Sequence, residues 1–212
     1  MYETIQGLPL FKGTTTDQIS SFLEKTNVEF VNFRPGHVLA EAGKQCADLR
    51  FVISGRVRSC MSLSGGRASL VYVSGYGTVL SPCCLFGLHT SYPVSVESID
   101  EGSYMLIRKD QYLELLQTDT IYLLNYLNYL GFHAQRSGMA LRGLCGMRLG
   151  GWVESIRNGL LERRTLEARV NTTRAGLCEI LGLAPQAVER ELEAICQSGD
   201  VKLEGDLSLV LV

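Results

Sequence analysis

The 212-residue sequence has no excess of positive charge and no long apolar run. Its 20 Lys and Arg residues are outnumbered by 22 Asp and Glu residues, which gives a formal net charge of −2. Nucleic-acid-binding proteins are often basic overall, so any such binding here must depend on a local patch. No apolar stretch approaches the ~20 residues that a membrane-spanning helix needs. The sequence therefore predicts a protein without a membrane span.

The sequence also lacks a secretory signal and a disulfide framework. Its first residues, MYETIQGLPLFKG, contain no basic segment followed by an apolar core, so we expect a cytoplasmic protein. The cysteines are odd in number and lack close, regular spacing, so we expect mostly reduced thiols, several of them buried. They lie at positions 46, 60, 83, 84, 145, 178 and 196.

No motif of a common enzyme class is present. The sequence contains no P-loop, no GxSxG nucleophile elbow, no HExxH helix and no paired-cysteine metal motif. Cys83 and His89 are the candidate nucleophile and base, and nothing in the sequence supplies a third group to orient them. We therefore expect neither catalysis nor a bound metal.

Residues 28–108 have the pattern of many short strands separated by glycine-marked turns. Apolar and polar residues alternate in segments such as VEFVNF and ASLVYVS, and turn signals recur every ~8–12 residues. This pattern is typical of an antiparallel β-sandwich or barrel. We place this first domain at residues 1–108, with a short helix near its N-terminus.

Apolar residues recur at helical spacing from Lys109 onward. They form a seam of two residues in seven, which predicts a long helix that pairs with a second copy of the chain. The alternative is a helix packed on its own β-domain, for which Tyr122, Tyr126 and Tyr129 form a suitable neighbouring face. The seam consists of Leu123, Leu127, Leu130, Ala134, Ser137, Leu141 and Leu144.

Closely spaced glycines in GLCG, residues 143–146, predict a hinge after this helix. The helical region accordingly covers residues 109–145, and a smaller domain covers residues 146–212. The first helix of that domain, over residues 147–161, should bury one apolar face. Its members are Trp152, Val153, Ile156 and Leu160.

The rest of the smaller domain carries signals for two helices, a tight turn and a hairpin. Thr172 or Thr173 suits the N-cap of a helix that Gly182 ends in a left-handed conformation. Pro185 suits the first position of the next helix, where its missing N–H costs nothing. The final VKLEGDLSLVLV has two strand-like halves around EGD. These elements predict a winged helix-turn-helix.

In this order and spacing, the landmarks resemble the CRP/FNR family of transcription regulators, typified by the cyclic AMP receptor protein and the fumarate and nitrate reduction regulator. The resemblance begins at LPLFKG, continues through FRPGHVLAEAG and FVISGRVR, and ends with TRAGLCEILGLAPQAVEREL. It implies an α+β protein with an N-terminal cyclic-nucleotide-binding-like β-roll (jelly roll), a long dimerisation helix and a C-terminal winged helix-turn-helix. The implied partners are promoter DNA, RNA polymerase and a second copy of the chain.

The family's nucleotide pocket uses a Gly-Glu pair at the ribose and an Arg-Ser pair at the cyclic phosphate. Here Ser81-Pro82 and Tyr92-Pro93 occupy the corresponding positions, so both charged partners are missing. Loss of a charge-assisted arginine contact sacrifices roughly 1.5–3 kcal/mol. We therefore expect neither cyclic AMP nor cyclic GMP to bind at physiological affinity.

The replacement segment, SPCCLFGLHTSY, leaves several effectors open. Cys83 and Cys84 lie near His89 and could sense oxidants or bind a soft metal, although burial as ordinary core residues is the simpler interpretation. Arg67 could point into the roll or be a solvated turn charge. A neutral effector, or none, is the remaining option, so no cofactor is predicted. The tentative pocket consists of Arg67, Ser81, Cys83, Cys84 and Tyr92.

Two cofactors known to serve such sensors receive little support. An iron–sulfur cluster of the fumarate and nitrate regulator type needs a cysteine cluster near the N-terminus, and the first cysteine here is Cys46. Haem has His37, His89 and His133 as available ligands, but isolated histidines are more often surface or capping residues.

The resemblance places the DNA-reading positions on the helix that begins at Pro185. Gln186 can contact adenine and Arg190 can contact guanine or phosphate, while the alternative is that Glu189 and Arg190 simply pair on a solvated face. Hydroxyls and charge at the start of the preceding helix suit phosphate. The predicted DNA-binding residues are Thr172, Thr173, Arg174, Pro185, Gln186, Glu189 and Arg190.

The sequence therefore predicts a dimeric, sequence-specific DNA-binding regulator. The alternative is an interaction or scaffold protein that retains the fold without DNA binding, which the acidic EREL segment at residues 189–192 favours.

Overall fold

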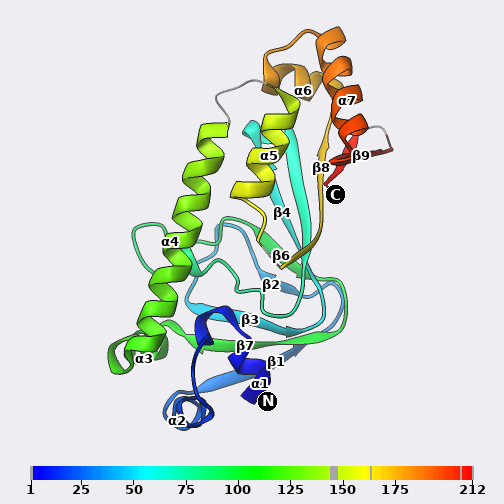
Figure 1. The fold of residues 1–212 in the computed structure, drawn as a ribbon. Helices are drawn as coiled ribbons and strands as arrows, with labels where there is room; N and C mark the ends of the chain where they lie inside the picture. The colour runs from blue at the N-terminus through cyan, green and yellow to red at the C-terminus, as the bar shows by residue number, and fades with distance from the viewer. Residues whose placement is uncertain (1, 144–147, 163, 206, 212) are drawn as a thin grey trace. The chain divides into compact units, whose positions relative to one another are not determined.

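The computed structural model describes residues 2–143, 148–162, 164–205 and 207–211 (Figure 1). The chain forms two compact units, Met1–Arg58 with Ser74–Phe132, and Ser59–Val73 with His133–Val212. This division differs from the sequence-based boundaries, because residues 59–73 were expected in the first domain but belong to the C-terminal unit. The expected hinge and Leu144 lie outside the described residues, apart from Gly143.

The first unit is built on antiparallel strands, as predicted. β1 (Val28–Phe33), β7 (Gly102–Arg108) and β3 (Asp48–Ser54) form a sheet in that order, with Val28 opposite Ile107 and Asp48 opposite Arg108. β2 (Val38–Ala40) pairs with β6 (Ser95–Ser98). The N-terminal part adds α1 (Tyr2–Gln6), the 3-10 turn η1 (Pro9–Phe11) and α2 (Thr16–Lys25).

Aromatic side chains fasten these helices to the sheet. Phe11 contacts Phe51 of β3 with ring centroids 5.7 Å apart, and it also contacts Phe22 of α2 and Tyr122. All four rings are at most 2% exposed, so this cluster is the centre of the first unit's core. Thr15 begins α2 through a capping box with Gln18.

The helical period after Lys109 belongs to two helices. α3 (Lys109–Thr118) and α4 (Thr120–Gly143) are separated at Asp119, whose backbone is extended. The Asp119 side chain accepts a hydrogen bond from the amide of Ile121 at 3.0 Å, and its other oxygen accepts from Gln18 at 3.1 Å. Aspartate that bonds nearby amides competes with a continuous helix, and the described positions of the seam all lie on α4.

The second unit combines a hairpin from the middle of the chain with the C-terminal elements. The strands β4 (Val57–Leu63), β5 (Ala68–Ser74), β8 (Thr165–Thr172), β10 (Ser208–Leu211) and β9 (Val201–Glu204) are neighbours in that order. The helices are α5 (Leu149–Gly159), α6 (Arg174–Leu181) and α7 (Pro185–Ser198).

Ala68 and Leu70 of the hairpin share a core with Trp152 of α5, Leu177 of α6 and Val188 of α7. The expected apolar face of α5 is buried at Trp152 but not at Leu160, which is 37% exposed. Leu160 is the C-cap of α5, and its amide still donates to the carbonyl of Ile156.

Strand β8 was not expected from the sequence. Its residues Ala168 and Val170 are buried in the core, whereas Arg169 and Asn171 are exposed, so this part alternates as a half-buried strand should. Leu166 lies on the same face as Ala168 but is 60% exposed. The final hairpin was predicted correctly, since β9 and β10 pair antiparallel.

Candidate functional site

The start of α6 is organised as the sequence predicts. Thr173 is the N-cap, and its hydroxyl accepts a hydrogen bond from the amide of Gly176 at 2.9 Å. Gly182 ends the helix with φ of 63° and ψ of 30°, a left-handed conformation that suits glycine. Pro185 then occupies the first turn of α7. The two helices are therefore joined by a turn of three residues, 182–184.

Helix α7 has one buried face and one solvent-facing face. Val188 and Leu192 are at most 2% exposed, while Gln186 and Arg190 are exposed to solvent. No ion pair involves Arg190 among the residues that the structure describes. Both side chains are therefore free to contact a ligand from outside the molecule.

Arg174 and Glu189 form an ion pair, with Nε and Oε1 2.5 Å apart. The alternative prediction, in which Glu189 pairs with Arg190, is wrong, because the carboxylate turns toward α6 instead. The two side chains are about half exposed, so the pair contributes at most ~1 kcal/mol to stability. Its main effect is electrostatic, since it neutralises a predicted phosphate-binding cation.

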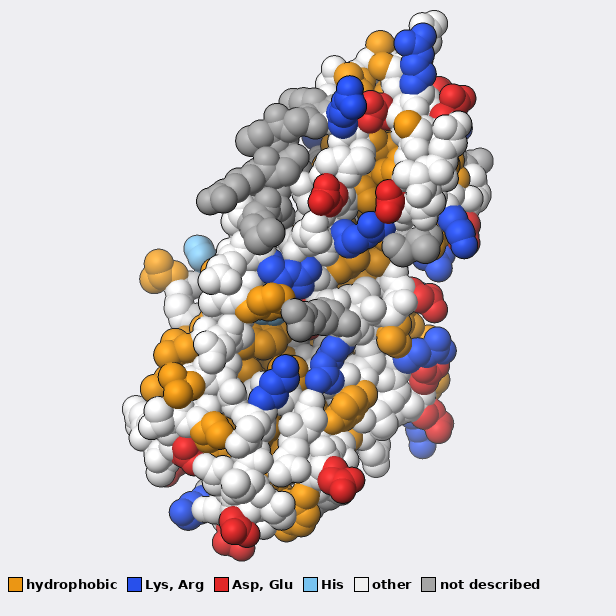
Figure 2. All heavy atoms as spheres, viewed as in Figure 1, with side chains coloured by type: hydrophobic (Ala, Val, Ile, Leu, Met, Phe, Trp, Pro, Cys, Tyr) orange, Lys and Arg blue, Asp and Glu red, His pale blue; other side chains and the backbone are white. Residues whose placement is uncertain are grey.

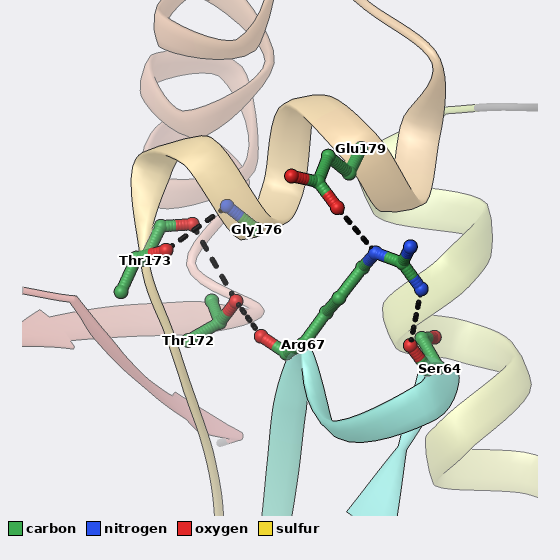
Figure 3. Close-up of polar contacts among 6 residues, drawn as sticks. All are labelled: Ser64, Arg67, Thr172, Thr173, Gly176 and Glu179. Carbon is green, nitrogen blue, oxygen red and sulfur yellow. Dashed lines mark hydrogen bonds and ion pairs between the residues drawn. The ribbon is translucent and has the colours of Figure 1, made fainter.

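Thr172 bonds within the protein rather than presenting its hydroxyl to solvent. Its Oγ1 donates to the backbone carbonyl of Arg67 at 2.9 Å (Figure 3). A Cβ added to Gly176 would lie 2.8 Å from the same carbonyl, so the β4–β5 turn can approach α6 only because residue 176 is a glycine. Thr172 holds the hairpin to the start of α6.

Arg67 does not line a pocket in the β-roll. Its Nε forms an ion pair with Glu179 of α6, and its Nη1 donates to the carbonyl of Ser64 at 3.0 Å (Figure 3). The tentative placement of Arg67 beside an effector is therefore wrong, because the strand turn carries it into the second unit. The half-exposed side chain joins the hairpin to α6.

The segment that the sequence resemblance aligned with the nucleotide-binding loop forms a tight turn in the first unit. Ser81 has a left-handed backbone with φ of 44°, and Pro82 begins a single 3-10 turn, η3 (Pro82–Cys84). The carbonyl of Pro82 accepts a hydrogen bond from the Tyr126 hydroxyl at 2.9 Å. Tyr126 thus links this turn to helix α4 through a buried hydrogen bond.

The two thiols of this turn are reduced and in contact. The Sγ atoms of Cys83 and Cys84 are 3.8 Å apart, with Cys83 exposed and Cys84 half-buried. The expectation that both are core residues is wrong for Cys83. Burial, together with the neighbouring Cys83 thiol, raises the pKa of Cys84 to about 12. His89 is exposed, and no group of three or more metal-ligating side chains is found among the described residues.

Tyr92 lies in the interior of the first unit beside a paired arginine. Burial raises the pKa of its hydroxyl, which is placed near Cys46 and Arg50. Arg50 donates to both carboxylate oxygens of Asp48, at 2.6 and 3.1 Å, and its guanidinium lies over the Tyr104 ring. This arginine is therefore already neutralised and satisfied within the protein.

The predicted seam of α4 is largely solvent-facing in the single chain and lies next to the tyrosine face. Tyr122 and Tyr126 are at most 5% exposed, whereas Leu127 is 52% exposed and Leu123 is 36% exposed. Hydrophobic side chains are correspondingly visible where the first unit's part of α4 lies (Figure 2). Leu130 is half-buried, Ala134 and Ser137 are exposed, and the side chain of Leu141 lies outside the described residues.

Both interpretations of α4 are therefore compatible with one helix. Its tyrosine face packs on the first unit, while its leucine face has no cover from the described residues of the same chain.

No described helix is long and apolar enough to cross a membrane.

Comparison with known proteins identifies the first domain. The family described as cyclic nucleotide-binding domain matches residues 30–119. The N-terminal domain of a transcriptional regulator from Streptomyces coelicolor A3(2) is 16% identical, with a TM-score of 0.52 over 65% of this chain and 94% of that chain. The sensor domain of the transcriptional regulator DNR from Pseudomonas aeruginosa is 18% identical, with a TM-score of 0.50 over 62% and 91%.

A likeness along most of the chain is weaker. The catabolite activator protein of Thermus thermophilus is 19% identical over 96% of this chain and 93% of its own, with a TM-score of 0.49. No curated protein matches the chain. The comparisons thus concern the fold, and residues 30–119 have the fold of a cyclic nucleotide-binding β-roll.

Proposed function

We propose that this chain is a dimeric, sequence-specific DNA-binding transcription regulator whose sensor does not bind cyclic AMP or cyclic GMP. The observation that carries the proposal is α7, which follows α6 after a three-residue turn and exposes Gln186 and Arg190 while burying its other face. Together with the hairpin β9–β10, these helices make a winged helix-turn-helix. As in the regulators that the sequence resembles, RNA polymerase is the expected second partner.

The chemistry of the exposed face suits the major groove. Glutamine can bond the adenine edge through two atoms, and arginine can do the same to guanine. The amides at the start of α6 suit a phosphate, because the N-terminus of a helix carries partial positive charge. Thr173 already accepts from one of these amides and Thr172 bonds Arg67, so both hydroxyls act by positioning the helix.

The exposed leucine face of α4 supports dimerisation with a second copy. Leu123 and Leu127 are one helical turn apart and both face solvent, so two copies could cover them against each other. A dimer also provides two reading helices, which compensates for the low net charge through effective concentration.

Loss of cyclic-nucleotide binding is supported by the charges within the roll. Tyr92 supplies no positive charge where the family uses arginine, and Arg50 is held by both oxygens of Asp48. A cyclic phosphate would have to displace that carboxylate to gain a charge-assisted bond. Isothermal calorimetry should detect no micromolar binding of either nucleotide, and a micromolar dissociation constant would contradict this part of the proposal.

The test of DNA reading is an anisotropy titration against DNA from upstream of the chain's own gene. The wild type is compared with Gln186→Ala and Arg190→Ala, and Arg34→Ala removes one exposed positive charge from the first unit as a matched control. We expect selective binding that falls about 10-fold or more in Arg190→Ala, consistent with ~1–3 kcal/mol per base contact, and that is unchanged in the control.

The competing function is an interaction or scaffold protein, and the Arg174–Glu189 pair favours it by lowering the positive potential beside α7. That function is supported instead if the purified dimer shows no selective binding to any fragment of a genomic DNA library.

A further inference from the structure

The turn Pro82–Cys84 presents two thiols to solvent in a fixed arrangement. Proline restricts the first residue of the turn, and the Tyr126 hydroxyl holds its carbonyl at 2.9 Å. Within this turn the Sγ atoms of Cys83 and Cys84 are 3.8 Å apart, and Cys83 is exposed. The pair is therefore both accessible and held in place.

A direct disulfide between these neighbours would be strained. Cα atoms joined by a trans peptide are ~3.8 Å apart, while disulfides usually need ~4.4–6.8 Å between Cα atoms. The sulfur atoms would also have to approach to ~2.05 Å. A disulfide at this turn would consequently distort the backbone and be easily reduced.

An atom that bonds both sulfur atoms does not require them to approach each other to disulfide distance. Two bonds of ~2.3 Å that meet at a tetrahedral angle separate their sulfur atoms by ~3.8 Å, as in zinc thiolate sites. This span belongs to a tetrahedral centre and equals the observed separation of Cys83 and Cys84. Trivalent arsenic is pyramidal with a smaller S–As–S angle, so its capture requires the exposed Cys83 side chain to rotate and bring the two sulfur atoms slightly closer. Thiolates also select soft, thiophilic partners over oxygen-loving ions.

We propose that Cys83 and Cys84 together capture one thiophilic centre, and that the chemical class it suits best is a monosubstituted trivalent arsenical. Such a compound completes its bonding with two thiols. The described residues provide no third metal-ligating side chain at this turn, so a metal ion would have to retain ligands from solvent.

The proton balance favours the arsenical over a metal ion. Condensation of R–As(OH)₂ with two thiols forms two As–S bonds, breaks two As–O bonds and releases two waters, without oxidation or net release of protons. A divalent ion that binds the same two thiols must release two protons. Because the pKa of Cys84 is raised to about 12, that release is unfavourable at neutral pH.

The test uses the reduced full-length chain with phenylarsine oxide, followed by native mass spectrometry. We expect one phenylarsenic adduct per chain in the wild type, none in Cys83→Ser or Cys84→Ala, and reversal by excess ethanedithiol. Cys60→Ser removes an exposed thiol outside the turn and should retain the adduct. Circular dichroism checks the fold of each variant, and Cys83→Ser at the exposed position serves if Cys84→Ala does not fold.

A second arm titrates Cd²⁺ and follows the thiolate charge-transfer absorption. Absence of the arsenical adduct from the wild type, or its persistence in Cys83→Ser, overturns the proposal. Tight Cd²⁺ binding without any arsenical adduct overturns the assigned ligand class. None of these measurements involves DNA, so their outcome is independent of the proposed transcriptional function.

Discussion

Arg67 and Glu179 pair across 112 positions of sequence, and together with Thr172 they tie the β4–β5 hairpin to helix α6 (Figure 3). The ion pair itself is about half exposed, whereas the backbone of Arg67 approaches Gly176 closely. The close backbone approach should therefore contribute more to stability than the charges.

Gly176→Ala should lower the free energy of unfolding by about 1–3 kcal/mol, because the added Cβ would overpack against the Arg67 carbonyl. Arg67→Ala should cost less than about 1 kcal/mol. Urea unfolding followed by the fluorescence of Trp152, which lies in the same core, measures both. Gly150→Ala, with open space around its Cβ, is the control and should be neutral or stabilising. Equal effects of Gly176→Ala and Gly150→Ala would contradict this account.

Glu189→Gln should strengthen non-specific DNA binding by releasing Arg174 from its ion pair. One additional phosphate contact steepens the dependence of log K on log salt concentration by about 0.9. Anisotropy titrations at several salt concentrations measure this slope. Glu193→Gln makes the same charge change at an exposed position on α7 and should leave the slope nearly unchanged. An equal slope for both variants would mean that Arg174 does not contact phosphate.

Leu127→Glu should convert the proposed dimer into a monomer, because it places a charge in the centre of the exposed leucine face of α4. Sedimentation velocity measures the oligomeric state at matched concentrations. Leu113→Glu changes a similarly exposed leucine on α3 and should leave the dimer intact. A dimer that survives Leu127→Glu would show that another surface is used.

The protein should lose stability in alkaline solution, in part through Cys84. Its pKa rises from an ordinary value of about 9 to about 12 in the folded state, so folding favours the neutral thiol. The associated stability is complete below about pH 9 and is lost as the pH approaches 12. Urea midpoints measured across this range should fall less steeply in Cys84→Ala than in Cys60→Ala. Identical slopes in the two variants would exclude this contribution.

Local chemistry made part of the architecture predictable from the sequence. A threonine cap at Thr172 or Thr173, the left-handed Gly182 and the first-turn Pro185 were all predicted, since each depends on the local preference of one residue, and the structure places the cap at Thr173. The alternation of short strands likewise indicated an antiparallel β-domain, and the family resemblance specified a β-roll.

Contacts between distant residues could not be predicted in this way. A pair between Glu189 and its neighbour Arg190 was the alternative to DNA reading, but the partner of Glu189 is Arg174 on another helix. Arg67 was placed beside an effector because its hairpin was assigned to the first domain. β8 was not predicted although Ala168 and Val170 alternate with polar residues, because its strand pattern runs directly into the threonine cap of α6 without a separating turn signal.

The origin of the β4–β5 hairpin has a consequence for how this protein can change in evolution. The C-terminal unit includes Ala68 and Leu70, which are encoded far upstream of the rest of its core. A single recombination crossover near residue 145 would therefore combine α5 to β10 of one relative with the β4–β5 hairpin of the other, and the core contacts of Ala68 and Leu70 would be mismatched. Productive exchange of this unit between relatives requires two exchanged segments, so its sequence should diverge together with that of the hairpin.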